Sequence, residues 1–227
     1  MIPWKLLDRA KVPGSTSELV LYQRGDEFSI RVDGHELMSS RMYASEDELA
    51  VLSCARIKDC PKPRVLIGGL GMGYTLATTL AALGPKAEVV VAELVPAVVE
   101  WNKTHFGHVA KHPLRDRRVK VLEEDVGQVM RSRPGAYDAI MLDVDNGPEG
   151  LTRKSNDRLY DQSGIAQALS ALRPGGVLAV WSAGANRAFV GRLRRAGMNV
   201  DEVAVRSRGA RGGARHTLWF ATRGRRG

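Results

Sequence analysis

The sequence is poor in cysteine, in aromatic residues and in long apolar runs. Its 227 residues include two cysteines, Cys54 and Cys60, and aromatic residues make up 6%. A zinc site needs a tighter cysteine pair and more ligands, so we expect two reduced thiols. No apolar stretch approaches the ~20 residues that cross a bilayer. The start, MIPWKLLDRAK, lacks the apolar core of a signal peptide, and we expect a cytoplasmic protein without a membrane segment.

Several motifs that identify enzymes are also missing. The sequence contains no Walker lysine motif, no H-E-x-x-H helix and nothing that resembles a nucleophilic serine elbow. His105, His108 and His112 form a histidine run, but Gly107 and Pro113 disturb a helix there and no carboxylate completes a ligand set. We therefore expect no metal.

Charge is unevenly distributed along the chain. Residues 1–186 are neutral, whereas residues 187–227 hold eleven arginines against Asp201 and Glu202 and carry the whole net charge of +9. A basic segment of this kind suits RNA, DNA or another polyanion. Because no aromatic residues are interleaved with the arginines, a solvated hairpin face and tail is the favoured interpretation. Nucleic-acid binding stays open but is not favoured.

Most of the chain alternates short apolar strands with helices. We expect strands at 64–67, 88–92, 119–122, 139–142 and 177–181, and helices near 74–83, 96–104, 126–132, 160–172 and 188–196. This alternation predicts a parallel sheet covered on both faces. Stretches 200–205 and 216–221 predict an antiparallel hairpin at one edge. The expected fold class is α/β and Rossmann-like, with a mostly parallel seven-stranded sheet and helices on both faces.

The first 60 residues predict a smaller unit ahead of this sheet. We expect strands at 18–22 and 27–32 and a helix at 45–57 that Ser45 caps. Pro61 and Pro63 mark the boundary. The predicted domains are a β-hairpin and helix unit over 1–60, and a nucleoside-binding transferase domain with a basic C-terminal hairpin over 61–227.

The most informative segment is a glycine turn between the strand at 64–67 and the next helix. Gly69, Gly71 and Gly73 form this turn, and Glu93 follows 20 residues later at the end of the second strand. Glycines let the backbone approach a ligand, and a helix N-terminus offers unpaired N–H groups. An acid at the next strand tip can accept both ribose hydroxyls. The pattern predicts a nucleoside-bearing ligand, and the dense glycines favour an S-adenosylmethionine fold over an NAD fold.

Further acids follow the third and fourth strands, where ligands lie in open α/β sheets. Asp125 suits an adenine amino group, and Val126 beside it offers a backbone N–H. Asp143 stands where a base facing a transferred carbon would lie, and Asp145 comes two residues later. Each aspartate also suits a helix N-cap, so both interpretations stay open.

These segments resemble the spermidine synthase (polyamine aminopropyltransferase) family over roughly residues 18–182. Residues 65–73 resemble its glycine loop, 91–99 its ribose-binding strand and helix, and 138–143 the strand that ends in its catalytic aspartate. Residues 159–176 resemble the helix and turn after its gate loop. Residues 46–50 resemble the junction where an acid closes a tyrosine–histidine–glutamate motif.

The resemblance implies transfer of an aminopropyl group from decarboxylated S-adenosylmethionine to a polyamine-type amine, with release of methylthioadenosine. Asp143 and Asp145 would be catalytic, and Gly69, Gly71, Gly73, Glu93, Asp125 and Val126 would hold the donor. Glu48 and Tyr160 would bind the small-molecule amine. A homodimer is expected only as a base rate among soluble enzymes.

The amine half departs from the family pattern. Glu46 and Asp47 replace the tyrosine–histidine pair, and Leu37 stands where a cofactor-contacting glutamine is expected. Two alternatives therefore stay open. One is a methyltransferase that uses S-adenosylmethionine in the same cofactor site, and the other is a non-catalytic nucleoside- or RNA-binding module.

Overall fold

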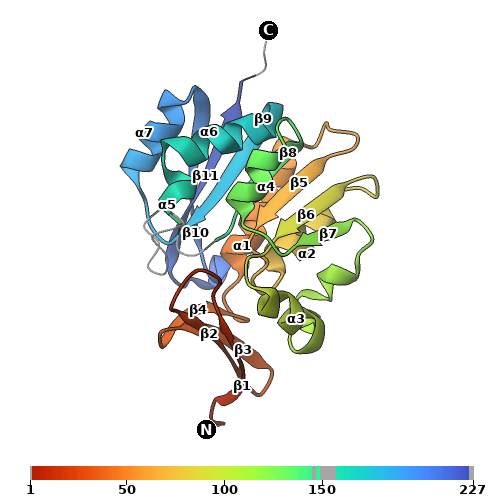
Figure 1. The fold of residues 1–227 in the computed structure, drawn as a ribbon, viewed down its shortest axis with the longest axis vertical. Helices are drawn as coiled ribbons and strands as arrows, with labels where there is room; N and C mark the ends of the chain where they lie inside the picture. The colour runs from red at the N-terminus through yellow and green to blue at the C-terminus, as the bar shows by residue number, and fades with distance from the viewer. Residues whose placement is uncertain (1, 145–146, 149–156, 225–227) are drawn as a thin grey trace.

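The protein contains a small sheet near the N-terminus and a large sheet formed by the rest of the chain (Figure 1). A computed structural model describes residues 2–144, 147–148 and 157–224. Asp145, one of the two predicted catalytic aspartates, lies outside the described residues. None of the described helices is long and apolar enough to cross a membrane.

The small sheet is an antiparallel meander whose strands pair in sequence order. Its strands are β1 (Lys5–Lys11), β2 (Glu18–Arg24), β3 (Glu27–Val32) and β4 (His35–Ser39). Asp33 and Gly34 both have positive φ angles, as a two-residue hairpin turn requires. The sequence predicted β2 and β3 but not the two outer strands. Most side chains of β1 are exposed and charged residues interrupt its apolar pattern, which is usual for an edge strand.

The large sheet has seven strands in the order β10-β11-β9-β8-β5-β6-β7. They are β5 (Arg64–Gly68), β6 (Glu88–Ala92), β7 (Val119–Leu122), β8 (Tyr137–Leu142), β9 (Leu172–Ser182), β10 (Met198–Arg206) and β11 (Arg215–Arg223). The first five are parallel, and β11 runs antiparallel between β9 and β10. The predicted mostly parallel sheet with a terminal hairpin is therefore confirmed.

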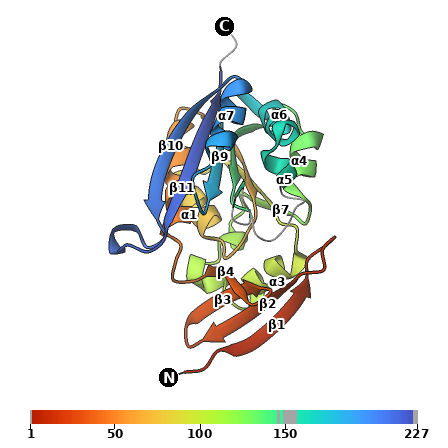
Figure 2. The ribbon, with the colours of Figure 1, turned by 90° about the vertical axis from the view of Figure 1, so that its left-hand side faces the viewer.

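Helices cover both faces of the large sheet (Figure 2). They are α1 (Ala44–Arg56), α2 (Tyr74–Ala82), α3 (Pro96–Thr104), α4 (Val126–Ser132), α5 (Asp157–Tyr160), α6 (Gln162–Ala171) and α7 (Arg187–Arg195). Alternate residues along each central strand point to opposite cores. On β5, Val65 and Ile67 pack with α1, α2 and α3, whereas Leu66 packs with α4 to α7. This burial on both faces explains why the strands are continuously apolar.

Helix α1 begins one residue before the predicted start. Tyr43 is its N-cap residue and makes no side-chain cap bond. The hydroxyl of Ser45 instead donates to Glu46 Oε2 at 2.6 Å, so the predicted Ser45 cap is wrong. The N–H of Ala44 donates to the carbonyl of Ser207 at 3.1 Å, which satisfies the first helical donor from the β10–β11 turn.

The division into domains at residue 60 stays a prediction.

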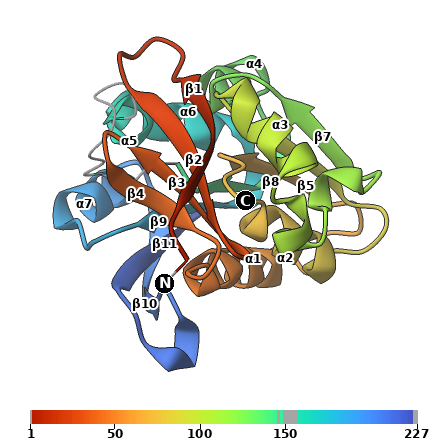
Figure 3. The same cartoon turned by 90° about the horizontal axis from the view of Figure 1, so that it is seen from below.

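The small sheet lies across the carboxyl ends of the central strands (Figures 1 and 3). Its apolar residues Leu19 and Val32 belong to the same buried core as Leu70 in the glycine turn and Val95 and Val98 near the start of α3. The two sheets therefore meet where parallel strands end and ligands bind in folds of this kind.

Candidate functional site

The glycine turn joins β5 to α2 in a conformation that only glycine adopts easily. Gly69, Gly71 and Gly73 have φ angles of +87°, +52° and +87°. A Cβ on Gly69 would collide with the carbonyl oxygen of Asp143, because the turn lies directly against the end of β8. The turn therefore needs glycine for two reasons: its φ angles are positive, and at Gly69 the backbone lies too close to the end of β8 for a side chain to fit.

Glu93 follows β6 and holds the glycine turn in place. Its Oε2 accepts the N–H of Leu70 at 2.8 Å, and its Oε1 accepts the N–H of Val95 at 2.8 Å. The side chain is only 7% exposed, and burial raises the pKa of its carboxyl. Hydrogen bonds from the backbone groups of Leu94 and Gly71 oppose this rise in pKa, as do those from Leu70 and Val95, so the carboxyl links the glycine turn to the start of α3.

A first cavity lies over the glycine turn and encloses about 850 Å³, part of it open to solvent. Four acids line it, namely Glu93, Glu124, Asp125 and Asp143. No lysine, arginine or histidine does so within the part of the chain that the structure describes. The cavity is therefore suited to a ligand with positive charge.

Asp125 and Val126 both line this first cavity. Asp125 is also the N-cap residue of α4, because its Oδ1 accepts the N–H of Gln128 at 3.0 Å. The helix-cap interpretation of Asp125 is thus correct, and the side chain still faces the cavity. Capping uses one acceptor position, which leaves others for a ligand.

Asp143 ends β8 and lies between two cavities. Its N–H donates to the carbonyl of Gly68 at 2.9 Å, and its Oδ2 accepts the hydroxyl of Thr75 at 2.6 Å. Burial of the carboxyl raises its pKa. The sequence prediction did not include Thr75, although a hydroxyl one residue into the helix after a glycine turn is well placed to reach a neighbouring strand tip.

The second cavity extends from Asp143 towards the β10–β11 hairpin, and its volume of about 1060 Å³ includes space open to solvent. It shares Leu37, Met38, Gly71 and Asp143 with the first cavity. Its other lining residues include Glu46, Tyr74, Thr75, Trp181, Ser207, Ala214 and His216. Two adjoining cavities with a carboxyl between them can hold two reactants on either side of that carboxyl.

Glu46, not Glu48, reaches the second cavity. Glu48 is exposed and lines neither cavity, so its predicted substrate-binding role has no support in its position. The two residues differ by about 200° around the helix, since each residue turns an α-helix by about 100°. The pKa of the Glu46 carboxyl is raised by burial and further by the negative charge of Asp143.

Tyr160 is also placed away from the cavities. It is 2% exposed, and its ring packs edge-on against Phe189 with the ring centres 5.7 Å apart. Its hydroxyl donates to the carbonyl of Val144 at 3.4 Å. The neighbouring Leu159 lines the first cavity instead. Tyr160 thus packs behind the wall of the first cavity, and its predicted role in binding the amine stays a prediction.

The raised pKa values give stability a defined pH dependence. The folded state raises the pKa of both Glu46 and Asp143, so it binds protons at these carboxyls more tightly than the unfolded chain does. The contribution of this protonation to the free energy of unfolding is fully present at acidic pH, and it is lost as pH rises through the raised pKa values. We expect Glu46→Gln, which removes one charge, to raise the free energy of unfolding by about 1 kcal/mol at mildly alkaline pH and to leave it unchanged at acidic pH.

Urea unfolding of this variant at both pH values provides the measurement. Glu48→Gln is a matched control, because the exposed Glu48 lies on the same helix and makes the same chemical change. An equal gain in both variants would show that Glu46 is not held against the charge of Asp143.

The fold and the site geometry define a Rossmann-like α/β protein with an acid-lined cavity at the carboxyl ends of its parallel strands. Residues 57–186 match the spermine/spermidine synthase domain, and the chain belongs to that family. It is 28% identical over 166 residues to a polyamine aminopropyltransferase of Mycobacterium tuberculosis, covering 72% of this chain and 30% of the relative. It is 31% identical over 119 residues to putrescine N-methyltransferase 1 of Nicotiana tabacum, covering 52% of this chain and 30% of the relative.

Solved structures show the same fold. The crystal structure of spermidine synthase from Thermotoga maritima superimposes with a TM-score of 0.73 at 16% identity, covering 96% of this chain and 73% of that one. A spermidine synthase in complex with the transition state analogue AdoDATO gives a TM-score of 0.72 at 16% identity, with 96% and 72% covered. The chain spans less than a third of the length of its Mycobacterium tuberculosis relative.

Proposed function

We propose that this protein transfers an aminopropyl group from decarboxylated S-adenosylmethionine to an amine. The charge of the first cavity carries the proposal, because acids line it and no basic side chain does so among the described residues. The decarboxylated donor has a sulfonium and an ammonium group, whereas intact S-adenosylmethionine also has a carboxylate that needs a donor or a cation. Curated relatives named as polyamine aminopropyltransferases support the same reaction.

The residues of the first cavity suit the nucleoside part of this donor. Glu93 would accept the ribose hydroxyls and Asp125 the adenine amino group. Gly71 lines both cavities and carries no side chain, which would leave room for the ligand. The donor supplies an electrophilic methylene carbon next to a sulfonium leaving group.

The residues of the second cavity would prepare the amine. Asp143 would take a proton from the attacking nitrogen, because a carboxyl with a raised pKa is a better base near neutral pH. Thr75 would orient that carboxyl through its hydrogen bond. Glu46 would bind a second positive group of the acceptor by a charge-assisted bond. Alignment of the two reactants would supply much of the rate gain.

Product identification tests the proposal. The protein is incubated with decarboxylated or intact S-adenosylmethionine and a panel of amines, and the products are analysed by mass spectrometry. We expect methylthioadenosine and an amine heavier by one aminopropyl group with the decarboxylated donor only. Calorimetry with both donors gives a second readout, in which the decarboxylated form binds more tightly. Equal or tighter binding of intact S-adenosylmethionine would contradict aminopropyl transfer.

Methyl transfer is the second candidate function. The similarity to a putrescine N-methyltransferase over about half of this chain favours it. The same cofactor residues would serve, and the acceptor would gain a methyl group. A methylated amine formed from intact S-adenosylmethionine in the experiment above would select this alternative.

A further inference from the structure

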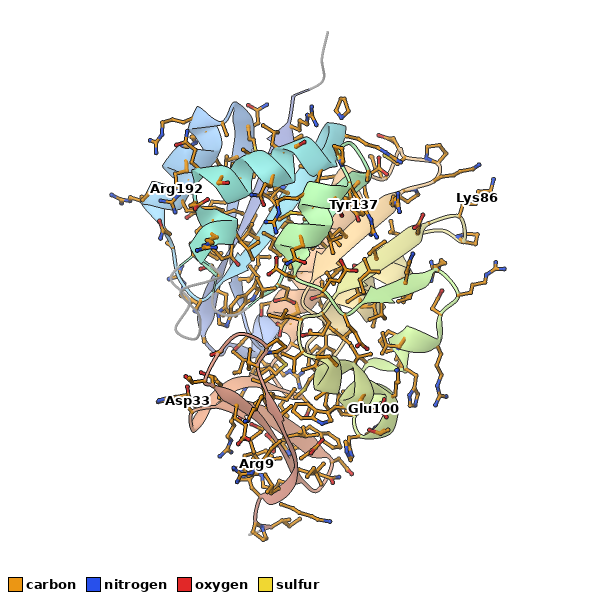
Figure 4. The ribbon with its side chains drawn as sticks, in the orientation of Figure 1. Arg9, Asp33, Lys86, Glu100, Tyr137 and Arg192 are labelled. Atoms are coloured by element: carbon orange, nitrogen blue, oxygen red, sulfur yellow. The ribbon has the colours of Figure 1, made fainter. Side chains whose placement is uncertain are left out.

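Two neighbouring residues of β4, Leu37 and Met38, line both cavities. Strand β4 begins two residues after Asp33, which Figure 4 labels on the small sheet. Consecutive side chains of a regular strand point to opposite faces of the sheet, so only one of two neighbours is expected at a given site. The presence of both residues at the same place therefore needs a local cause.

A β-bulge is that cause. In the pairing of β3 with β4, Ile30 lies opposite Met38. The next residue of β3, Arg31, lies opposite Glu36, so Leu37 is an extra residue without a counterpart in this pairing. A bulge turns a side chain away from its regular direction, and bulges are frequent beside active sites. Here the bulge brings Leu37 to the cavities together with Met38.

The residues that line both cavities form the boundary between them. They are Leu37, Met38, Gly71 and Asp143. The side chain of Met38 reaches from the small sheet to the glycine turn, since a Cβ built on Gly71 would lie 3.4 Å from its Sδ and 3.6 Å from its Cε. We call Leu37 and Met38 the boundary pair. Among the four residues, Asp143 alone has a polar side chain.

Polar side chains line each cavity away from this boundary. Glu93 and Asp125 lie in the first cavity, and Glu46 and Thr75 lie in the second. A water molecule inside a protein needs several polar partners, and the side chains of the boundary offer it only Asp143. The boundary is therefore the part of the site that holds water least well.

Water is the competitor that an aminopropyltransferase has to exclude. The methylene carbon next to the sulfonium of the donor is open to attack by water as well as by an amine, and Asp143 would accept a proton from either. Attack by water would form a C–O bond, break the C–S bond and yield aminopropanol, methylthioadenosine and a proton. Enzymes prevent such side reactions by closing the reaction site to water.

We propose that Leu37 and Met38 are positioning residues that keep water away from the carbon under attack, so that an amine and not water receives the aminopropyl group. The amine nitrogen reaches the donor between this boundary pair and Asp143. Apolar surroundings also favour the neutral amine over its ammonium form, because burial disfavours charge. This inference rests on the proposed aminopropyl transfer and adds to it the residues that select the nucleophile.

The partition of the donor between amine and water measures this selection. Decarboxylated S-adenosylmethionine is incubated with putrescine, and aminopropanol and aminopropylated amine are quantified by mass spectrometry in the same sample. We expect Met38→Ala to raise the ratio of aminopropanol to amine product by at least about tenfold, since the loss of a single apolar group already changes discrimination by about this factor. Leu37→Ala should act in the same direction. Met38→Leu retains the apolar volume and should keep the wild-type ratio.

Met42→Ala is the matched control. Met42 is also half-buried and lines the second cavity, but it does not line the first. The same atoms are then removed away from the boundary, so the ratio should stay close to that of the wild-type protein. An equal rise in Met42→Ala, or an unchanged ratio in both Met38→Ala and Leu37→Ala, would overturn the inference.

Thiol labelling tests the position of Met38 without turnover. In Met38→Cys, the new thiol should react with iodoacetamide more slowly when methylthioadenosine fills the first cavity, and also when putrescine fills the second. In Met42→Cys, only putrescine should slow the reaction. Peptide mass spectrometry separates both positions from the native thiols of Cys54 and Cys60. Protection of the thiol in Met38→Cys by one ligand alone, or by neither, would overturn the inference.

Failure of this inference and failure of the proposed function give different results. If the wild-type protein forms no aminopropylated amine, aminopropyl transfer fails, and the labelling experiment still decides whether Met38 lies between two ligand sites. If amine product forms and the boundary variants all keep the wild-type ratio, aminopropyl transfer stands and the boundary pair does not select the nucleophile.

Discussion

Replacing Asp143 with asparagine is expected to lower turnover by about 10²- to 10⁴-fold, the contribution usual for a general base. The side chain lies between the two cavities, and its Oδ2 is held by the hydroxyl of Thr75. Asparagine keeps the shape but cannot accept a proton from an attacking amine. Because the nucleoside contacts proposed for Glu93 and Asp125 are unchanged and only one of four acids loses its charge, the dissociation constant of the donor should rise far less than turnover falls.

Steady-state kinetics and calorimetry on the same preparation measure both quantities. Asp47→Asn is the matched control, since Asp47 is also an acid near the site, accepts a bond from Thr78, and lines neither cavity. The control should retain most of its activity. Unchanged turnover in Asp143→Asn would remove this residue from the proton-accepting role.

Gly69→Ala is expected to destabilise the protein by at least about 2 kcal/mol, from a positive φ angle in a residue with a Cβ and from a steric collision. The new methyl group would collide with the carbonyl oxygen of Asp143, which belongs to the backbone and cannot rotate away. Relief of this collision has to move either the glycine turn or the end of β8. Donor affinity should therefore fall together with the free energy of unfolding.

Gly71→Ala makes the same chemical change two residues later in the same turn. Its φ angle is +52°, and the nearest atom to a new Cβ is the Sδ of Met38 at 3.4 Å, in a flexible side chain. This control should lose only about 1 kcal/mol from the backbone conformation. Urea unfolding compares the two variants. Equal losses would show that contact with the Asp143 carbonyl does not determine the cost at Gly69.

The parallel sheet and the residues at its strand tips could be predicted because topology alone determines where they lie. Continuous apolar strands between helices define a doubly covered sheet, and the carboxyl ends of such strands meet at one edge. Gly69, Glu93, Asp125 and Asp143 all occupy that edge. Their neighbours in space follow from strand order, which the alternation of strands and helices already indicates.

Residues whose positions depend on helix phase or on distant packing could not be predicted in this way. The choice between Glu46 and Glu48 depends on where α1 begins, and the carbonyl of Ser207, more than 150 residues away, takes part in fixing that start. Leu37 and Met38 reach the cavities only because the small sheet lies across the large one. His216 reaches the second cavity because β11 lies between β9 and β10.

The wall that the small sheet contributes to the first cavity has a thermodynamic consequence. Leu19 and Val32 from the small sheet, and Val12 from its β1–β2 connection, face the same space as Glu93 and Asp125 at strand ends of the large sheet. A ligand held there touches both sheets and binds only while they are together. Its binding free energy therefore adds to the free energy that holds the sheets together, and the occupied protein behaves as one cooperative unit when it unfolds.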